Sequence, residues 1–242
     1  MENLIIYKSP FNKRRIGKNN DGGYVIIDLP NNYDLFLSGG ISNDNTFESE
    51  FLKLYPNIIC YAFDGTINNL PQKNDKIIFI KKNLGKYNDN HSTNLHEYME
   101  DYENSFMKID IEGHEFRLFP TFFENGYINK IKQLVFELHS PADIELHPKY
   151  FDGLNDIKND HMFELLKQLN KTHTLLHLHA NNGCKMNNID GINIPHVFEL
   201  TYIRNDFISE KINNDEPLPT KIDMKNIQRL PDHSLNGYPY NF

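Results

Sequence analysis

Two apolar runs of the sequence end in side chains that can move a proton. The run that begins at Phe106 ends in Asp110, and the run that begins at Gln133 ends in Glu137 and His139. Alternate residues of a strand share one face, so Glu137 can orient His139. A histidine has an ordinary pKa close to neutrality, which makes His139 our first candidate for a general base and Asp110 our second. The alternative for either residue is a purely structural role.

A glycine pair followed by an aspartate is typical of a nucleotide site. The run 34–40 ends in Gly39 and Gly40, where the backbone can approach a ligand without side-chain obstruction. Asp64 lies about 24 residues farther on, close to the spacing at which an acidic residue binds ribose hydroxyls. The alternative is an ordinary turn aspartate. The Gly-x-Gly-x-x-Gly pattern is absent, which counts against a nicotinamide-dependent sugar-modifying enzyme.

A metal site is a further alternative. Asp110, Glu137 and His139 offer ligands for a divalent ion that would lower the pKa of an acceptor hydroxyl. His177 and His179 share a strand face and suit zinc, but no third and fourth ligand follows at a recognisable spacing. A divalent metal is therefore an alternative that we do not favour.

The positions of these groups depend on the elements that the apolar pattern predicts. Strands are expected at 34–40, 58–63, 76–80, 105–112, 133–139, 172–179 and 197–203, and helices at 47–54, 93–101, 116–123 and 151–170. Pro120 is expected to interrupt the third helix, and residues 141–148 are expected to form a loop. Five strand–helix alternations and a final strand pair predict an α/β fold, with helices on both faces of a mostly parallel sheet that has one antiparallel strand.

A single domain is expected over residues 1–210. It begins with a hairpin within residues 1–33, whose turn contains the Asp21-Gly22-Gly23 segment. These glycines are either simple turn formers or a place where the backbone approaches a ligand. Four prolines after residue 210 argue against regular structure, so residues 211–242 are expected to run as an extended tail over the surface.

Composition disfavours several kinds of partner. The net charge of −8 is unsuited to nucleic acid, because phosphate backbones attract patches of Lys and Arg. No run approaches the roughly 18 apolar residues of a membrane span. Two cysteines, and an N-terminus without an apolar signal region, predict a cytoplasmic protein whose thiols stay reduced.

Six segments, taken in order, resemble the FkbM-type S-adenosylmethionine-dependent methyltransferases, in particular a branch with an Asp-Gly-Gly-Tyr-Val motif near its N-terminus. They are Asp21–Val25, Ser38–Asp44, Tyr61–Asp64, Met107–Glu115, Val135–His139 and His177–Asn182. The segment Met107–Glu115, which contains Lys-Ile-Asp-Ile-Glu-Gly-His-Glu, is the most specific. The first glycine motif departs from the fuller glycine-rich pattern of the family, and the tail after Lys211 lies outside the resemblance.

The resemblance implies a Rossmann-like class I methyltransferase sheet that binds S-adenosylmethionine, with Asp110 near the reactive methyl group. The resemblance and the loops that follow the expected strands together assign these residues to the cofactor: Gly39, Gly40, Ser42, Asp44, Asp64, Gly65, Asn83 and Asp110. The residues expected in the acceptor pocket are His114, His179 and Asn181. The family methylates hydroxyls, which predicts an O-methyltransferase acting on a sugar or glycoside. A catalytically silent binding module with the same fold is the alternative.

Overall fold

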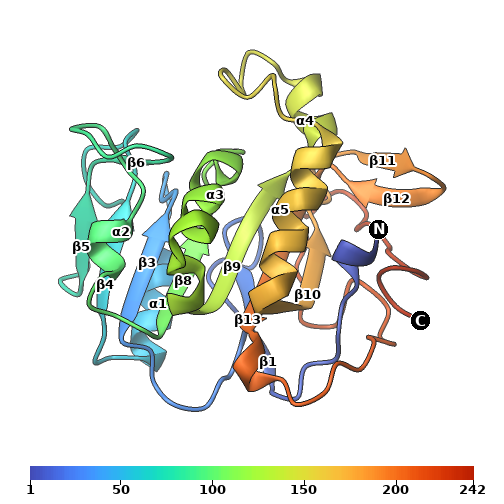
Figure 1. Ribbon diagram of the computed structural model, residues 1–242, viewed down its shortest axis with the longest axis horizontal. Coiled ribbons are helices and arrows are strands. Elements are labelled where there is room, and N and C mark those ends of the chain that lie inside the picture. Colours follow the sequence, from blue (N-terminus) through green and yellow to red (C-terminus); the bar gives the residue numbers. More distant parts are fainter.

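A seven-stranded sheet runs through the centre of the protein in a computed structural model that describes all residues, 1–242 (Figure 1). In chain order its strands are β3 (Leu35–Gly39), β4 (Ile59–Phe63), β5 (Ile77–Ile80), β8 (Ser105–Ile109), β9 (Ile131–His139), β10 (His173–Ala180) and β13 (Val197–Arg204). Their spatial order is β10-β13-β9-β8-β3-β4-β5, and β13 runs in the opposite direction to the other six strands. The predicted α/β class and the mostly parallel sheet with one antiparallel strand are confirmed.

The central strands β3, β8 and β9 are buried along their whole lengths. Both of their faces are covered, which explains why their sequences are apolar runs rather than alternating patterns. In β3, for example, Leu35 and Leu37 belong to one core, and Phe36 between them belongs to the core on the other face.

Helices cover both faces of this sheet. On one face pack α3 (Glu115–Asn125) and α5 (Asn159–Thr172), as Figure 1 shows. On the other face α1 (Thr46–Leu54) packs together with the expected N-terminal hairpin, which consists of β1 (Lys13–Ile16) and β2 (Tyr24–Ile27). The hairpin is therefore fixed against the sheet.

Two expectations about the helices on the α3 side are wrong. Pro120 does not interrupt α3, because the buried stripe that includes Phe116, Phe119 and Phe122 holds the helix against the sheet on both sides of the proline. Residues 141–148 are not a loop throughout, since α4 (Pro141–Leu146) begins with Pro141 at its first position, where a missing N–H does no harm.

Two further helix expectations are wrong in their bounds. The helix expected at 151–170 begins only at Asn159. The helix expected at 93–101 shrinks to α2 (His96–Met99), because Thr93 belongs instead to β7 (Ser92–Thr93), which pairs with β6 (Asn83–Leu84). In both cases the segment before the helix forms tertiary contacts, which cannot be predicted from the helical spacing of its apolar residues.

The segments outside the central sheet also contain order. Residues between β10 and β13 form a hairpin, β11 (Met186–Ile189) and β12 (Ile192–Pro195), joined by Asp190 and Gly191 with positive φ. The C-terminal tail (residues 211–242) has no helix or strand, yet three of its side chains lie in the main core. They are Leu218, Leu235 and Tyr240.

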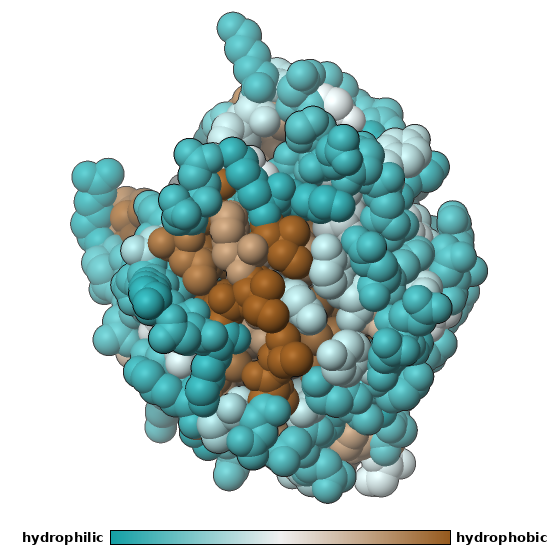
Figure 2. All heavy atoms as spheres, turned by 90° about the vertical axis from the view of Figure 1, so that its left-hand side faces the viewer, coloured by the Kyte–Doolittle hydropathy of each residue, from teal (hydrophilic) through white to brown (hydrophobic).

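The side of the molecule at β5 is thinly covered. β5 is an edge strand, and no helix lies between β4 and β5 in the chain. Figure 2 shows an apolar patch on this side, and Ile59 of β4 and Ile78 of β5 are 43% and 47% exposed. None of the helices combines the length and apolar character needed to span a bilayer.

Candidate active site

A cleft of about 870 Å³ opens at the carboxyl ends of β3, β4 and β8, which is the edge where parallel sheets bind ligands. Hydrogen bonds join the three strand ends directly. The amide of Gly40 donates to the Phe63 carbonyl and the amide of Asp110 donates to the Gly39 carbonyl, each at a distance of 3.0 Å. The volume suits a small molecule. Six of the residues expected in the site line the cleft: Gly40, Ser42, Asp64, Asn83, Asp110 and His114.

Three residues assigned to the cofactor do not line the cleft. A Cβ atom on Gly39 would lie 2.3 Å from Leu84 Cδ1, and one on Gly65 would lie 2.3 Å from Asn83 Oδ1. These glycines leave room for side chains of the cleft wall rather than for a ligand. Asp44 accepts hydrogen bonds at the start of α1 and so stabilises that helix end.

The loops after β3 and β8 contain left-handed backbone. Gly40 has φ +77°, and a Cβ atom there would lie 1.5 Å from the Asp110 carbonyl oxygen. Ser42 and Glu112 have φ of 50° and 55° although neither is glycine. Such conformations carry strain of order 1–3 kcal/mol each and gather at ligand sites. The backbone geometry therefore marks the same edge as the cleft.

The Asp64 carboxylate holds the glycine loop to the end of β4. Its Oδ2 accepts hydrogen bonds from the amides of Ile41 and Ser42, at 3.0 and 2.7 Å. Its Oδ1 accepts from the amide and the hydroxyl of Thr66, at 2.7 and 2.5 Å. Burial acts to raise its pKa, but these donors outweigh burial and lower the pKa. Asp64 is thus ionised, and its own chain supplies four donors to it.

Asp110 is the carboxylate that joins the cleft to the N-terminal hairpin. The Tyr24 hydroxyl donates to Asp110 Oδ2 over 2.7 Å, and Lys108 Nζ lies 3.8 Å from the same oxygen. Lys108 also donates to the Gly40 carbonyl over 2.8 Å. Both contacts are to Oδ2, so Oδ1 faces neither group. Sequence reasoning did not assign Tyr24 to the site, although it belongs to the Asp21–Val25 motif.

His139 contacts the cleft residue Glu112 and is surrounded by carboxylates. Its Nδ1 is 2.8 Å from Asp143 Oδ2, and its Nε2 lies 3.1 Å from Glu112 Oε2 and 3.5 Å from Glu137 Oε1. Burial acts to lower its pKa, but Asp143, Glu112 and Glu137 outweigh burial and raise the pKa far above its ordinary value. His139 is therefore a cation that ties these acids together, and it does not line the cleft. Asp143, in the first turn of α4, was not anticipated.

The remaining predicted residues lie beyond Asp110, at the ends of β9 and β10. Burial, reinforced by the charge of Asp110, raises the pKa of Glu137 to about 8. Asn181 Nδ2 donates to Glu137 Oε2 over 3.4 Å. His179 lies 2.9 Å from Glu199 Oε2 and 3.2 Å from Asp232 Oδ1. Burial acts to lower the pKa of His179, but these two acids raise it to about 10.

The predicted site thus falls into two neighbouring parts. One is the cleft, and the other is a set of buried acids, histidines and amides at the ends of β9, β10 and β13. Glu199 and the tail residue Asp232 belong to the second part and were not anticipated. The alternation of polar and apolar residues in β13 could have indicated Glu199, whereas nothing in the composition of the tail indicates Asp232.

Comparison with known protein families gives one match. The model of the Methyltransferase FkbM domain matches residues 5–172, which include the cleft, Asp110 and His139. The matched range ends just before β10, so it leaves out β13 and the C-terminal tail. No curated protein sequence matches the chain.

Several solved structures are distantly similar to the chain. A precorrin-6y C5,15-methyltransferase from Geobacter metallireducens GS-15 is 9% identical, with a TM-score of 0.34 over 73% of this chain and 84% of that one. The plantazolicin methyltransferase BpumL in complex with SAH is 9% identical, with a TM-score of 0.35 over 73% and 77%. A putative hemolysin from Streptococcus thermophilus is 13% identical, with a TM-score of 0.37 over 84% and 76%.

Proposed function

The chain belongs to the FkbM methyltransferase family, and from this premise we propose that it transfers a methyl group from S-adenosylmethionine to a hydroxyl group of a sugar or glycoside. The observation that carries the proposal is the cleft at the ends of β3, β4 and β8, which is lined by Asp64 and Asp110 from the two strands on either side of β3.

The residues of the cleft fit this cofactor. Asp64 offers an ionised carboxylate to a ribose diol, and the Thr66 hydroxyl is the one side-chain donor that a ribose hydroxyl would replace. Asn83 and Ser42 supply further polar groups, and the wall at Gly85 is open, since no atom lies within 4 Å of the place that a Cβ atom would occupy. When bound, S-adenosylmethionine supplies an electrophilic methyl group on a positively charged sulfur.

The chain must then position an oxygen nucleophile and accept its proton. Asp110 is the better placed of the two candidate bases, because it lines the cleft and because Tyr24 and Lys108 both contact Oδ2 and leave Oδ1 free for a hydroxyl. His139 already carries its proton in the resting protein and lies outside the cleft lining. We assign it a positioning role, in which it fixes Glu112 and Glu137.

The acceptor side of the site favours a polyhydroxylated molecule. His114 lines the cleft itself, and Glu137 and Asn181 lie beyond Asp110. These groups donate and accept hydrogen bonds, as recognition of several hydroxyls requires. The exposed Tyr150 ring at the cleft mouth adds a flat surface on which a sugar ring can pack.

Calorimetry with S-adenosylmethionine, its demethylated product and NAD tests the cofactor. We expect saturable binding of the first two and none of NAD. A screen of nucleotide sugars and glycosides, read by mass spectrometry, then tests the acceptor, and we expect one methyl group added to a hydroxyl. Binding of NAD without S-adenosylmethionine, or methyl transfer to nitrogen alone, would contradict the proposal.

A further inference from the structure

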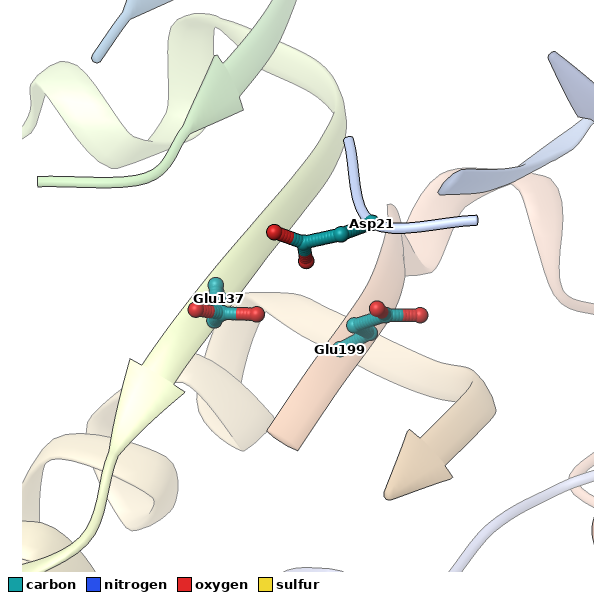
Figure 3. Close-up of side chains that lie close together, drawn as sticks. All are labelled: Asp21, Glu137 and Glu199. Atoms are coloured by element: carbon teal, nitrogen blue, oxygen red, sulfur yellow. The ribbon is translucent and has the colours of Figure 1, made fainter. Parts of the chain in front are cut away.

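Three acidic side chains from distant parts of the sequence meet next to Asp110. Asp21 comes from the turn between β1 and β2, Glu137 from β9 and Glu199 from β13, and one oxygen of each lies within 4.8 Å of the others (Figure 3). We call these three residues the carboxylate cluster. Glu137 and Glu199 are buried and stand directly opposite each other in the β9–β13 ladder, an arrangement in which like charges destabilise a sheet.

The side chain of Asn226, from the C-terminal tail, is aimed into this cluster. Its Nδ2 lies 2.5 Å from Glu199 Oε1 and 3.1 Å from Asp21 Oδ1, and the residue is only 4% exposed. Its Oδ1 is buried and accepts no hydrogen bond. A buried amide oxygen without a donor costs about 1–3 kcal/mol. Half a turn about the last side-chain bond would place this oxygen against the same two carboxylates.

The direct partners of the cluster acids are histidines and amides. Glu199 Oε2 is taken by His179, and Glu137 is approached by Asn181 at Oε2 and by His139 at Oε1. No lysine or arginine forms an ion pair with any of the three acids. Asp21 is exposed, so the cluster is open to solvent on one side. The place thus combines carboxylate oxygens and a route of entry with an unpartnered amide oxygen that rotation of the Asn226 side chain would bring to them.

We propose that the carboxylate cluster and the Asn226 amide oxygen bind one divalent cation of the class that prefers oxygen ligands, such as Mg²⁺, Mn²⁺ or Ca²⁺. This ligand set differs from the Asp110–Glu137–His139 set considered from the sequence, because two of its three acids and the amide lie in segments that sequence reasoning did not connect. Binding of the cation does not depend on the proposed function. The role of the cation does rest on the proposed function: a cation here would lower the pKa of an acceptor hydroxyl beside Asp110.

Titration of the full chain with Mn²⁺, followed by electron paramagnetic resonance without cofactor or acceptor, tests the site. We expect one saturable Mn²⁺ per chain at physiological salt, displaced by Mg²⁺ or Ca²⁺. Glu199→Gln and Asp21→Asn should each weaken binding at least tenfold, because each removes one anionic ligand. Glu145→Gln, which changes an exposed glutamate in α4, is the matched control and should bind Mn²⁺ as the natural chain does.

Three outcomes would overturn the proposal: no saturable Mn²⁺ binding up to millimolar concentration, binding that vanishes on raising salt to physiological strength, or unchanged binding in Asp21→Asn. Asp21 is exposed, so its substitution decides the matter even where Glu199→Gln does not fold. Calorimetry with S-adenosylmethionine on the same samples separates the two proposals. A chain that binds the cofactor but not Mn²⁺ loses only the metal site, and a chain that binds Mn²⁺ but not the cofactor loses only the proposed function.

Discussion

The two aspartates that line the cleft differ in how many hydrogen bonds their carboxylates accept, and this difference suits them to different roles. Asp64 receives four hydrogen bonds from its own chain, which fixes both its charge and the loop around it. Asp110 lines the cleft and receives one from Tyr24 at Oδ2, whereas its Oδ1 accepts none. A carboxylate whose two oxygens are both hydrogen-bonded can hold a loop and a ligand in place, whereas a carboxylate with a free oxygen can take up a proton.

Substitution of Asp64 should act on cofactor affinity. Asp64→Asn removes the charge that holds the Ile41 and Ser42 amides, and hydrogen bonds to a charged group contribute about 1.5–3 kcal/mol. We expect the affinity for S-adenosylmethionine to fall roughly ten- to a hundredfold. Calorimetry measures this, with Asp75→Asn, a largely exposed aspartate, as the control. Equal dissociation constants for both variants would remove Asp64 from the cofactor site.

Substitution of Asp110 should act on turnover. Asp110→Asn keeps the shape and the Tyr24 contact but cannot accept a proton, so kcat should fall about 10²–10⁴-fold while cofactor affinity changes little. His139→Gln should lower kcat less, because His139 positions Glu112 and Glu137 without touching the acceptor. Single-turnover rates distinguish the two. A larger loss in His139→Gln than in Asp110→Asn would return the role of base to His139.

At the scale of elements, His173 ties the beginnings of β10 and β9 together. It is fully buried, and its Nε2 lies 2.8 Å from the Ile131 carbonyl oxygen. Burial lowers its pKa to about 4, from an ordinary value near 6.5. The neutral ring is therefore favoured in the folded state. Its contribution to stability is fully present above pH 6.5 and is lost as the pH falls toward 4.

The free energy of unfolding should accordingly decrease on acidification. A shift of this size corresponds to about 3 kcal/mol between pH 7 and pH 4, since one pKa unit is worth about 1.4 kcal/mol. Urea denaturation at several pH values measures the slope. His173→Gln cannot titrate, so its stability should change less over the same range. If natural chain and variant show the same slope, His173 is not the group responsible.

The sequence predicts the strands far better than the connections. Buried parallel strands such as β8 and β9 are apolar runs that end in polar side chains, and this pattern is local. The ends of parallel strands meet at one edge, so Asp64 and Asp110 could be expected at the same edge of the sheet. Helix α4 and the β11–β12 hairpin were missed, although Ser140-Pro141 and Asp190-Gly191 are recognisable start and turn signals.

What the sequence could not show is the pairing of distant charges. The partners of Glu199 are His179 and Asn226, and no local pattern connects these three positions. The expected base, His139, becomes a buried cation only because Glu112, Glu137 and Asp143 surround it in space. The types of the residues were readable, whereas their protonation states depend on neighbours that only the fold brings together.

At the scale of the whole molecule, the C-terminal tail is a structural part of the domain. Two of its acids, Asp223 and Asp232, contact His177 and His179 of β10. The amide of Leu235 donates a 3.0 Å hydrogen bond to the Leu218 carbonyl, and both leucine side chains lie in the main core. Many residues of the tail are exposed, but Leu218, Leu235 and Tyr240 are packed in the main core.

Truncation of a buried tail side chain should therefore destabilise the entire domain. Leu235 is 2% exposed, and Leu235→Ala should lower the free energy of unfolding by about 2–5 kcal/mol. Ile212 is 51% exposed, and Ile212→Ala, the control, should change it by less than about 0.5 kcal/mol. Urea denaturation followed by circular dichroism measures both. Similar values for the two variants would mean that the tail is peripheral to the fold.

The contact between Asn226 and Asp21 spans 205 positions of the chain. During synthesis the first turn leaves the ribosome long before the tail that completes the carboxylate cluster. Every strand of the sheet is therefore synthesised before the tail side chains that complete both the carboxylate cluster and the main core, so a chain cut short within the tail would lack part of each.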